Sequence, residues 1–313
     1  MPHVRANGLQ ICYETFGNPS NPALLLIMGL GAQLVHWPDA FCEALAAGGY
    51  HVIRFDNRDI GLSEKLDHLG KPDLMRSGLL YTLRLPQKAG YRLDDMAEDA
   101  VALLDALKIK TAHVVGLSMG GMIAQVLGIR HASRVRSLTL IMTSSGNPWL
   151  KKPSLRVQMR MMSKPKARDR ESLLQFGMNT WRMIGSPGYP SPEPELREYV
   201  GRALDRNIHP QGLARQMVAI MASGSRVKQL SRIKAPTLII HGDKDPLVPV
   251  PAAHDLKKHI PEAQLEIIHG MGHDLPSALL PKLSHLILHH AKHAERSHGR
   301  KPGTPAGRSA ARA

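Results

Sequence analysis

This 313-residue sequence gives little indication of disulfide bonds or of membrane-spanning segments. Its only two cysteines, Cys12 and Cys42, show no metal-ligand spacing, so we expect buried free thiols in an edge strand and a helix, with a disulfide as the alternative. Residues 1–5 lack the apolar run of a signal peptide, and the longest aliphatic block, 23–28, is too short to cross a bilayer. We therefore expect a cytoplasmic protein with no stable membrane insertion.

Aromatic residues are also scarce, at 4% of the chain, although hydrophobic residues make up 43%. Methionine is abundant, with 15 residues, so part of the apolar packing must come from its flexible thioether side chain, which fills irregular gaps and lines adaptable pockets. A chain of this length and composition is long enough for one large α/β domain or two small ones.

Acidic residues are few, 26 against 41 Lys and Arg, and the formal net charge is +15. The excess is concentrated: residues 151–170 hold eight Lys or Arg against one Asp, and residues 292–313 hold six against one Glu. The simplest interpretation is a solvated helix face and a disordered tail. No basic stripe is interleaved with aromatic residues, so we expect no nucleic-acid partner, whereas attraction of anionic substrates or anionic membrane surfaces is the alternative.

Strands and helices are predicted to alternate along most of the chain. Asn7-Gly8 predicts a hairpin within residues 3–16. Continuous apolar runs predict buried strands, and amphipathic stretches between them predict helices. The predicted strands are 23–28, 51–55, 112–115, 138–141, 236–240 and 265–268, and the helices are 38–48, 93–107 and 119–130. This order predicts an α/β fold with a mostly parallel sheet flanked by helices.

The alternation stops between residues 146 and 225, which contain no convincing strand. Three stretches there place apolar residues on one helical face, around Leu155, Met159 and Met162; Leu174, Met178 and Trp181; and Leu213, Met217, Ile220 and Met221. Residues 185–194 read as a loop. We therefore expect residues 146–225 to form a helical cap inserted in a core domain of residues 1–145 and 226–290.

The C-terminal residues 291–313 are basic and rich in Gly, Pro, Ala and Ser, so we expect a disordered tail. Four histidines near this region are expected to be solvated and inert: His289, His290, His293 and His298.

Ser118 is the candidate nucleophile. It stands in Gly116-Leu117-Ser118-Met119-Gly120, between a predicted β-branched strand and a predicted helix. In that setting a sharp turn holds the hydroxyl above the sheet, and the flanking glycines leave room for it. The Met119 amide, at the start of the helix, is expected to stabilise an oxyanion.

A serine nucleophile needs a base and an acid, and both follow predicted strands whose carboxyl ends share one edge of the sheet. Asp245 is favoured as the acid because the following proline extends its loop, with Asp243 as the alternative that could brace the turn. His273 is favoured as the base over His269, because Gly270 and Gly272 free its loop.

A second oxyanion donor is expected from the Gly-rich segment after the first long strand. Leu30 is the candidate donor and Gly29 the fallback, and a simple tight turn is the structural alternative. We expect the substrate pocket to include Trp37, Met178, Trp181 and Met217, which suits an apolar acyl or alcohol group of modest size.

Five segments, in this order, resemble the signatures of the α/β-hydrolase family over roughly residues 3–290: Met28-Gly29, 56–63, 116–121, 241–249 and 270–273. Met28-Gly29 and Arg58-Asp59 stand where most relatives carry His-Gly and Arg-Gly. These departures, with the segment 215–220, resemble the branch that includes aclacinomycin methylesterase. The resemblance implies a carboxylic ester hydrolase without cofactor or metal, with Ser118, Asp245 and His273 as triad.

Other functions fit the same framework. The triad could cleave amide or C–C bonds, as in prolyl aminopeptidases or ring-fission-product hydrolases, but residues 147–215 hold six acids against thirteen Lys and Arg, which disfavours binding of a free amine. Ser118 disfavours dehalogenase and epoxide hydrolase chemistry, where relatives use Asp. A non-catalytic small-molecule receptor is the alternative from another class. We expect a small-molecule ester substrate, and the sequence leaves the oligomeric state open.

Overall fold

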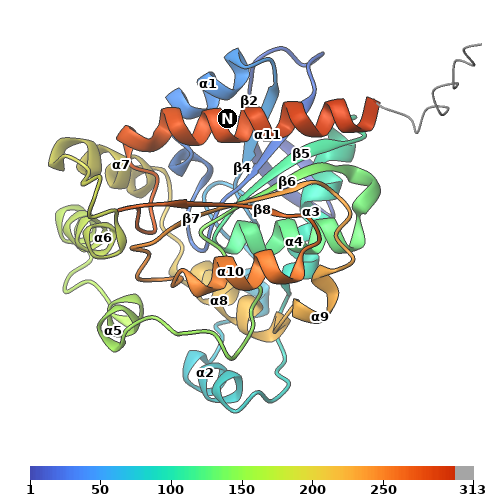
Figure 1. Cartoon of the computed structure of the whole chain (residues 1–313). Coiled ribbons are helices and arrows are strands. Elements are labelled where there is room, and N and C mark those ends of the chain that lie inside the picture. The colour runs from blue at the N-terminus through green and yellow to red at the C-terminus, as the bar shows by residue number, and fades with distance from the viewer. Residues whose placement is uncertain (300–313) are drawn as a thin grey trace, which may run out of the picture.

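The fold is built on one eight-stranded sheet, seen in a computed structural model that describes residues 1–299 (Figure 1). The strand order is β1-β2-β4-β3-β5-β6-β7-β8. Strands β3 to β8 are parallel to one another, whereas β1 and β2 run antiparallel to their neighbours. The strands are β1 (His3–Ala6), β2 (Leu9–Phe16), β3 (Ala23–Ile27), β4 (His51–Phe55), β5 (Ala112–Leu117), β6 (Val135–Ile141), β7 (Thr237–Gly242) and β8 (Gln264–Ile268). The predicted parallel sheet is confirmed.

Two hydrophobic layers enclose this sheet because β3, β4 and β5 are buried on both faces. One layer packs α3 (Leu93–Ala106), α4 (Met119–Arg130) and α10 (Pro251–His259) against the sheet. The other contains α1 (Asp39–Ala47) and α11 (Leu280–Gly299). Figure 1 shows these two sets of helices on opposite sides of the strands. The carboxyl ends of the six parallel strands therefore open at one edge of the sandwich, where the predicted site residues follow the strands.

The two cysteines are buried free thiols. Cys12 lies in β2 and pairs with His3 of β1, so the prediction of an edge strand for Cys12 was wrong: β1 covers that edge. Cys42 lies in α1 as predicted. Burial raises the pKa of Cys12 to about 11 and that of Cys42 to about 12, so both thiols stay protonated at neutral pH.

A helical insertion connects β6 to β7, at the position predicted for the cap. It contains α5 (Leu155–Met162), α6 (Arg170–Ile184), α7 (Glu193–Arg206) and α8 (Pro210–Ser223), and the short α9 (Val227–Leu230) follows it. Helix α7 was not predicted, and neither was α2 (Leu74–Thr82), which contacts α8. We call residues 146–225 the cap.

The predicted disordered tail begins too early. Helix α11 continues to Gly299, because Ala291 and Ala294 extend the buried face formed by Leu283 and Ile287. His290 is buried and lies 3.2 Å from the Pro236 carbonyl oxygen, so the prediction that it is solvated was also wrong. The rest of the predicted tail, 300–313, lies outside the described residues. No helix among residues 1–299 is long and apolar enough to span a membrane.

Candidate active site

Ser118 occupies a strained turn between β5 and α4. Its φ of 53° and ψ of −117° fall in a region that side chains other than glycine rarely adopt. The turn fits only because its neighbours are glycines: a Cβ atom at Gly120 would overlap the Ile27 carbonyl oxygen, and one at Gly116 would overlap the Gly120 carbonyl oxygen. Thr143 Oγ1 donates to the Ser118 carbonyl oxygen at 2.6 Å and ties the turn to the end of β6. The Ser118 side chain is thereby aimed away from the sheet edge.

His273 and Asp245 meet Ser118 from the loops after β8 and β7. His273 Nε2 lies 3.1 Å from Ser118 Oγ, and His273 Nδ1 lies 2.7 Å from Asp245 Oδ2. The other carboxylate oxygen of Asp245 accepts hydrogen bonds from the Leu247 and Val248 amides, at 2.8 and 2.7 Å. Both side chains are buried. The three residues favoured from the sequence therefore form one continuous hydrogen-bonded chain.

Asp243 and His269, the alternatives to Asp245 and His273, form a separate pair. His269 Nδ1 lies 2.7 Å from Asp243 Oδ2, and the His269 ring is 89% exposed. Asp243 Oδ1 accepts a hydrogen bond from the Gly270 amide at 2.8 Å, which holds the pKa of Asp243 below its usual value. Asp243 thus braces the loop that carries His273 and does not touch Ser118.

The segment after β3 lies beside Ser118, as expected for an oxyanion loop. A Cβ atom at Gly29 would stand 3.2 Å from the Ser118 Cβ atom, a tight contact that shows how closely this segment approaches Ser118. The Gly31 amide donates to Gln216 Oε1 at 2.9 Å and is therefore already used. Among the described residues, the Met119 and Leu30 amides have no hydrogen-bond acceptor. Met119, Leu30 and Gly29 all stay candidates for the oxyanion donors.

The predicted pocket residues separate into two groups. Trp37 is fully buried and stacks on Phe41 in the core, and Met178 is fully buried among the helices of the cap, so neither reaches a pocket surface. Their apolar character is explained by core packing. Trp181 does line a cavity of 780 Å³ between the cap and α1, whose lining includes Pro246 and Asp274, next in the chain to Asp245 and His273, but not Ser118. Met217 is half-buried on α8.

A second cavity, of 180 Å³, likewise has none of Ser118, Asp245 and His273 in its lining. Its wall includes Met122, one helical turn after Ser118, and Leu247 and Val248, whose amides bind Asp245. Its lining also includes residues 81, 82, 84, 147, 148 and 150–153. Among the described residues, no cluster of three or more His, Cys, Asp or Glu could hold a metal ion.

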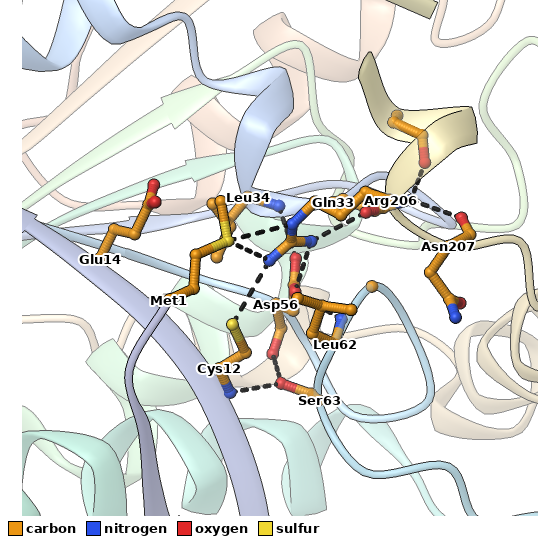
Figure 2. A network of polar contacts seen from close by, with 12 residues as sticks. Met1, Cys12, Glu14, Gln33, Leu34, Asp56, Leu62, Ser63, Arg206 and Asn207 are labelled. Carbon is orange, nitrogen blue, oxygen red and sulfur yellow. Dashed lines mark hydrogen bonds and ion pairs between the residues drawn. The ribbon is translucent and has the colours of Figure 1, made fainter. Parts of the chain in front are cut away.

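Two buried ion pairs fasten the cap to the core through the loop 56–63. Figure 2 shows the first, in which Arg206 at the end of α7 lies 2.7 Å from the Asp56 carboxylate. Asp56 is fully buried and also accepts hydrogen bonds from the Leu34 and Leu62 amides. Arg206 donates further to Gln33 Oε1 and approaches two sulfur atoms, Met1 Sδ and Cys12 Sγ. Burial raises the pKa of Asp56 although Arg206 opposes the shift.

The second pair explains the unusual Arg58-Asp59 of the sequence. Asp59 has a φ of 71°, the conformation that glycine adopts easily. Arg215 of α8 holds it with two hydrogen bonds, at 2.9 and 2.7 Å. Burial acts to raise the pKa of Asp59, but these hydrogen bonds hold it below its usual value. Asp59 therefore makes this turn less favourable than glycine would, but its carboxylate binds Arg215 and holds the cap to the core.

Gln216 links the cap to the segment after β3. Its Oε1 accepts the Gly31 amide and its Nε2 donates to the Arg58 carbonyl oxygen, each at 2.9 Å, and the side chain is fully buried. Sequence reasoning had singled out the segments 56–63 and 215–220 without assigning these contacts. The departure at Arg58-Asp59, together with the resemblance of residues 215–220 to the same branch, was the available signal.

Comparison with known proteins places these features in context. A family described as alpha/beta hydrolase fold matches residues 22–276. Rhodomycin D methylesterase DauP of Streptomyces sp. (strain C5) is 33% identical over 302 residues, covering 90% of this chain and 94% of that protein. The 3-oxoadipate enol-lactonase 2 of Acinetobacter baylyi is 27% identical, covering 85% and 88%. Among solved structures, a meta-cleavage product hydrolase from Pseudomonas fluorescens IP01 shares the fold with a TM-score of 0.72 at 20% identity, covering 94% and 98%.

Proposed function

The chain belongs to the α/β-hydrolase family and is a carboxylic ester hydrolase, and from this premise we propose that Ser118, His273 and Asp245 form its catalytic triad. The observation that carries the proposal is the relay of contacts from Ser118 Oγ to His273 Nε2 and from His273 Nδ1 to Asp245. A serine hydroxyl becomes nucleophilic only when such a base is within hydrogen-bond reach and held by a third group.

In the proposed reaction, Ser118 Oγ attacks the ester carbonyl carbon while His273 Nε2 takes the hydroxyl proton. The negative charge that develops on the carbonyl oxygen is stabilised by the Met119 amide and by the amide of Leu30 or Gly29. His273 then gives its proton to the departing alcohol, which leaves an acyl group on Ser118. Water, deprotonated by His273, hydrolyses this acyl-enzyme and restores the hydroxyl.

Asp245 fixes the orientation of the His273 ring in this scheme. Its Oδ2 accepts the Nδ1 proton, so that Nε2 carries the free lone pair toward Ser118. Since Oδ1 is already held by two backbone amides, the carboxylate cannot rotate without losing hydrogen bonds. Asp245 also stabilises the imidazolium that forms during the reaction.

The proposed substrates are small-to-medium apolar esters, with a methyl ester of an apolar acid as the first class to test. The 33% identity to a methylesterase supports a small alcohol group. The cavity of 180 Å³, whose wall includes Met122, Leu247 and Val248, supports the same choice, because it has room for only one modest group.

Ser118→Ala is the direct test of the proposed triad. We expect hydrolysis of p-nitrophenyl acetate to fall by several orders of magnitude, because only binding and the oxyanion donors would then assist the reaction. A fluorophosphonate probe should label the wild-type protein and leave the variant unlabelled. Comparable activity in the variant would rule out Ser118 as nucleophile, and absence of labelling in an inactive wild-type protein would favour a receptor.

The substrate class can be tested separately with two graded series. One series holds p-nitrophenyl esters of increasing acyl length, and the other holds methyl esters of increasingly bulky apolar acids. Higher kcat/KM on the methyl esters than on long-chain p-nitrophenyl esters is expected. The opposite order would keep the triad but overturn the proposed substrate class.

A further inference from the structure

The apolar face of helix α5, which the sequence pattern predicts, is exposed. Leu155, Met159 and Met162 follow one another at helical spacing and are 70%, 59% and 70% exposed. Val157 is the only buried residue of this helix. An amphipathic helix normally packs its apolar face against a core, so an outward-facing one needs another partner.

Helix α2 and the residues after it continue this exposed apolar surface. Met75 is 83% exposed, Leu79 59%, Leu83 57% and Leu85 51%. The guanidinium of Arg84 stacks over the Trp149 ring, 3.7 Å from its centre, which joins this segment to the one before α5. Residues of both segments also line the 180 Å³ cavity. In Figure 1, α2 and α5 project on the same side of the molecule, away from the sheet. We call residues 74–92 and 147–168 together the docking face.

The charge of the docking face has one sign. Residues 74–92 contain four Lys or Arg and no Asp or Glu, and residues 147–168 contain seven and none. Among these cations, Arg76, Lys88, Lys164 and Lys166 are exposed. Exposed apolar side chains set among cations match the polar heads and acyl chains of an anionic bilayer.

We propose that the docking face binds peripherally to the surface of an anionic lipid bilayer. The apolar side chains of α2 and α5 enter the boundary between head groups and acyl chains, while the surrounding Lys and Arg bind lipid phosphates. A second copy of the chain is a poorer occupant, because a two-fold contact would bring eleven cations of one subunit against eleven of the other. An acidic protein partner would also match the cations, but the face would then leave lipid vesicles unbound, so the vesicle test below distinguishes the two.

This orientation has a consequence for the site. Part of the lining of the 180 Å³ cavity is formed by residues of the docking face, among them Tyr81, Arg84 and Lys151, so docking would bring this cavity next to the lipid. On the proposed esterase function, an apolar ester dissolved in the bilayer would reach the site with less exposure to water. The docking itself does not depend on that function, because it concerns only the surface.

The test is sedimentation of the full-length protein with vesicles of phosphatidylcholine alone or with about one third phosphatidylglycerol. We expect binding to the mixed vesicles, little to the neutral ones, and weakening between about 0.05 and 0.5 M salt. The triple variant Lys88→Glu, Lys164→Glu, Lys166→Glu should bind at least about a hundredfold more weakly, since each lost surface cation contributes about fivefold and the new carboxylates repel the anionic lipid.

A matched control carries the same change of charge on the opposite edge of the sheet. Lys110 precedes β5, Lys234 precedes β7 and Lys258 ends α10, all at the amino ends of the parallel strands. Replacing these three with Glu should leave vesicle binding within a few-fold of wild type. An equal loss in this control would mean that net charge alone drives binding and would overturn the proposal.

A second triple variant, Met75→Ser, Leu155→Ser, Met159→Ser, tests how much the apolar side chains contribute to vesicle binding. It should reduce binding to the mixed vesicles while hydrolysis of a water-soluble ester stays unchanged, which also shows that it folds. Unchanged vesicle binding in this variant would overturn the proposed insertion. Absence of vesicle binding by the wild-type protein at low salt would overturn the proposed docking. If the wild-type protein instead forms a dimer in sedimentation velocity, does not bind vesicles, and loses the dimer in this variant, the docking face binds a second copy and the proposal is wrong.

Discussion

Replacing Arg206 with methionine should lower the free energy of unfolding by about 3–5 kcal/mol, the usual cost of removing one partner of a buried ion pair. The substitution keeps most of the aliphatic stem but leaves the fully buried Asp56 carboxylate without its cation. The two amides that bind Asp56, from Leu34 and Leu62, would stay in place. For about 300 ordered residues, an unfolding entropy of about 2.1 cal/mol/K per residue converts this loss into a fall in Tm of about 5–8 °C.

The pH dependence of this loss of stability tests more specifically whether the loss comes from Asp56. Burial already raises the pKa of Asp56, and loss of Arg206 should raise it further. The folded variant would then hold a proton that the unfolded chain has released, so its stability should fall as pH rises. The difference in Tm between Arg206→Met and wild type should therefore be larger at about pH 8 than at about pH 5.

Thermal unfolding followed by circular dichroism at both pH values measures this difference. In the double variant with Asp56→Asn, part of the loss should be recovered, because the buried charge is gone. A Tm within about 1 °C of wild type at about pH 8 would refute the reasoning, since the ion pair would then contribute almost nothing. A deficit that grows toward acidic pH would refute the assignment to Asp56.

Three further predictions concern the site and its surroundings. Asp245→Asn should lower kcat by about 10⁴-fold and Asp243→Asn by less than about tenfold, and equal losses would contradict their separate roles. Gln216→Leu should lower kcat by about tenfold with KM little changed, because Gly31 loses its acceptor, whereas Gln216→Glu, which keeps that acceptor, should retain more activity. Burial lowers the pKa of His36 to about 4, so unfolding titrations should show stability falling by up to about 3 kcal/mol as pH drops from 6.5 toward 4, and His36→Asn should flatten that slope.

The sheet and the site residues could be predicted because one physical rule governs each. Strands buried on both faces need continuous apolar runs, and residues 23–27 and 238–240 have them. Side chains that follow parallel strands meet at one edge, which brought Ser118, Asp245 and His273 together without any knowledge of their distances.

The cap could not be predicted in the same way, because a helical pattern does not say which surface covers an apolar face. Met178 and Met159 lie in similar patterns, yet one is fully buried and the other is 59% exposed. Helix α11 shows the reverse problem. Ala291 and Ala294 are too small to mark an apolar stripe among basic residues and histidines, and they are nevertheless buried.

The ion pairs between the cap and the core could not be predicted from the sequence, for a different reason. Arg206 and Arg215 lie about 150 positions from Asp56 and Asp59, and the cap alone offers thirteen Lys and Arg from which to choose. No local preference distinguishes the two that become buried. Only the docking of α7 and α8 on the core selects them.

The two buried ion pairs determine which segments must be exchanged together in engineered chimaeras. A cap taken from a relative with Arg-Gly in place of Arg58-Asp59 would bring no partner for the Asp59 carboxylate, and the recipient would keep a buried charge. Crossover points at the ends of the cap alone would therefore recombine poorly. Moving the loop 56–63 together with the cap would transfer both halves of each pair, so specificity could be exchanged as a two-segment cassette.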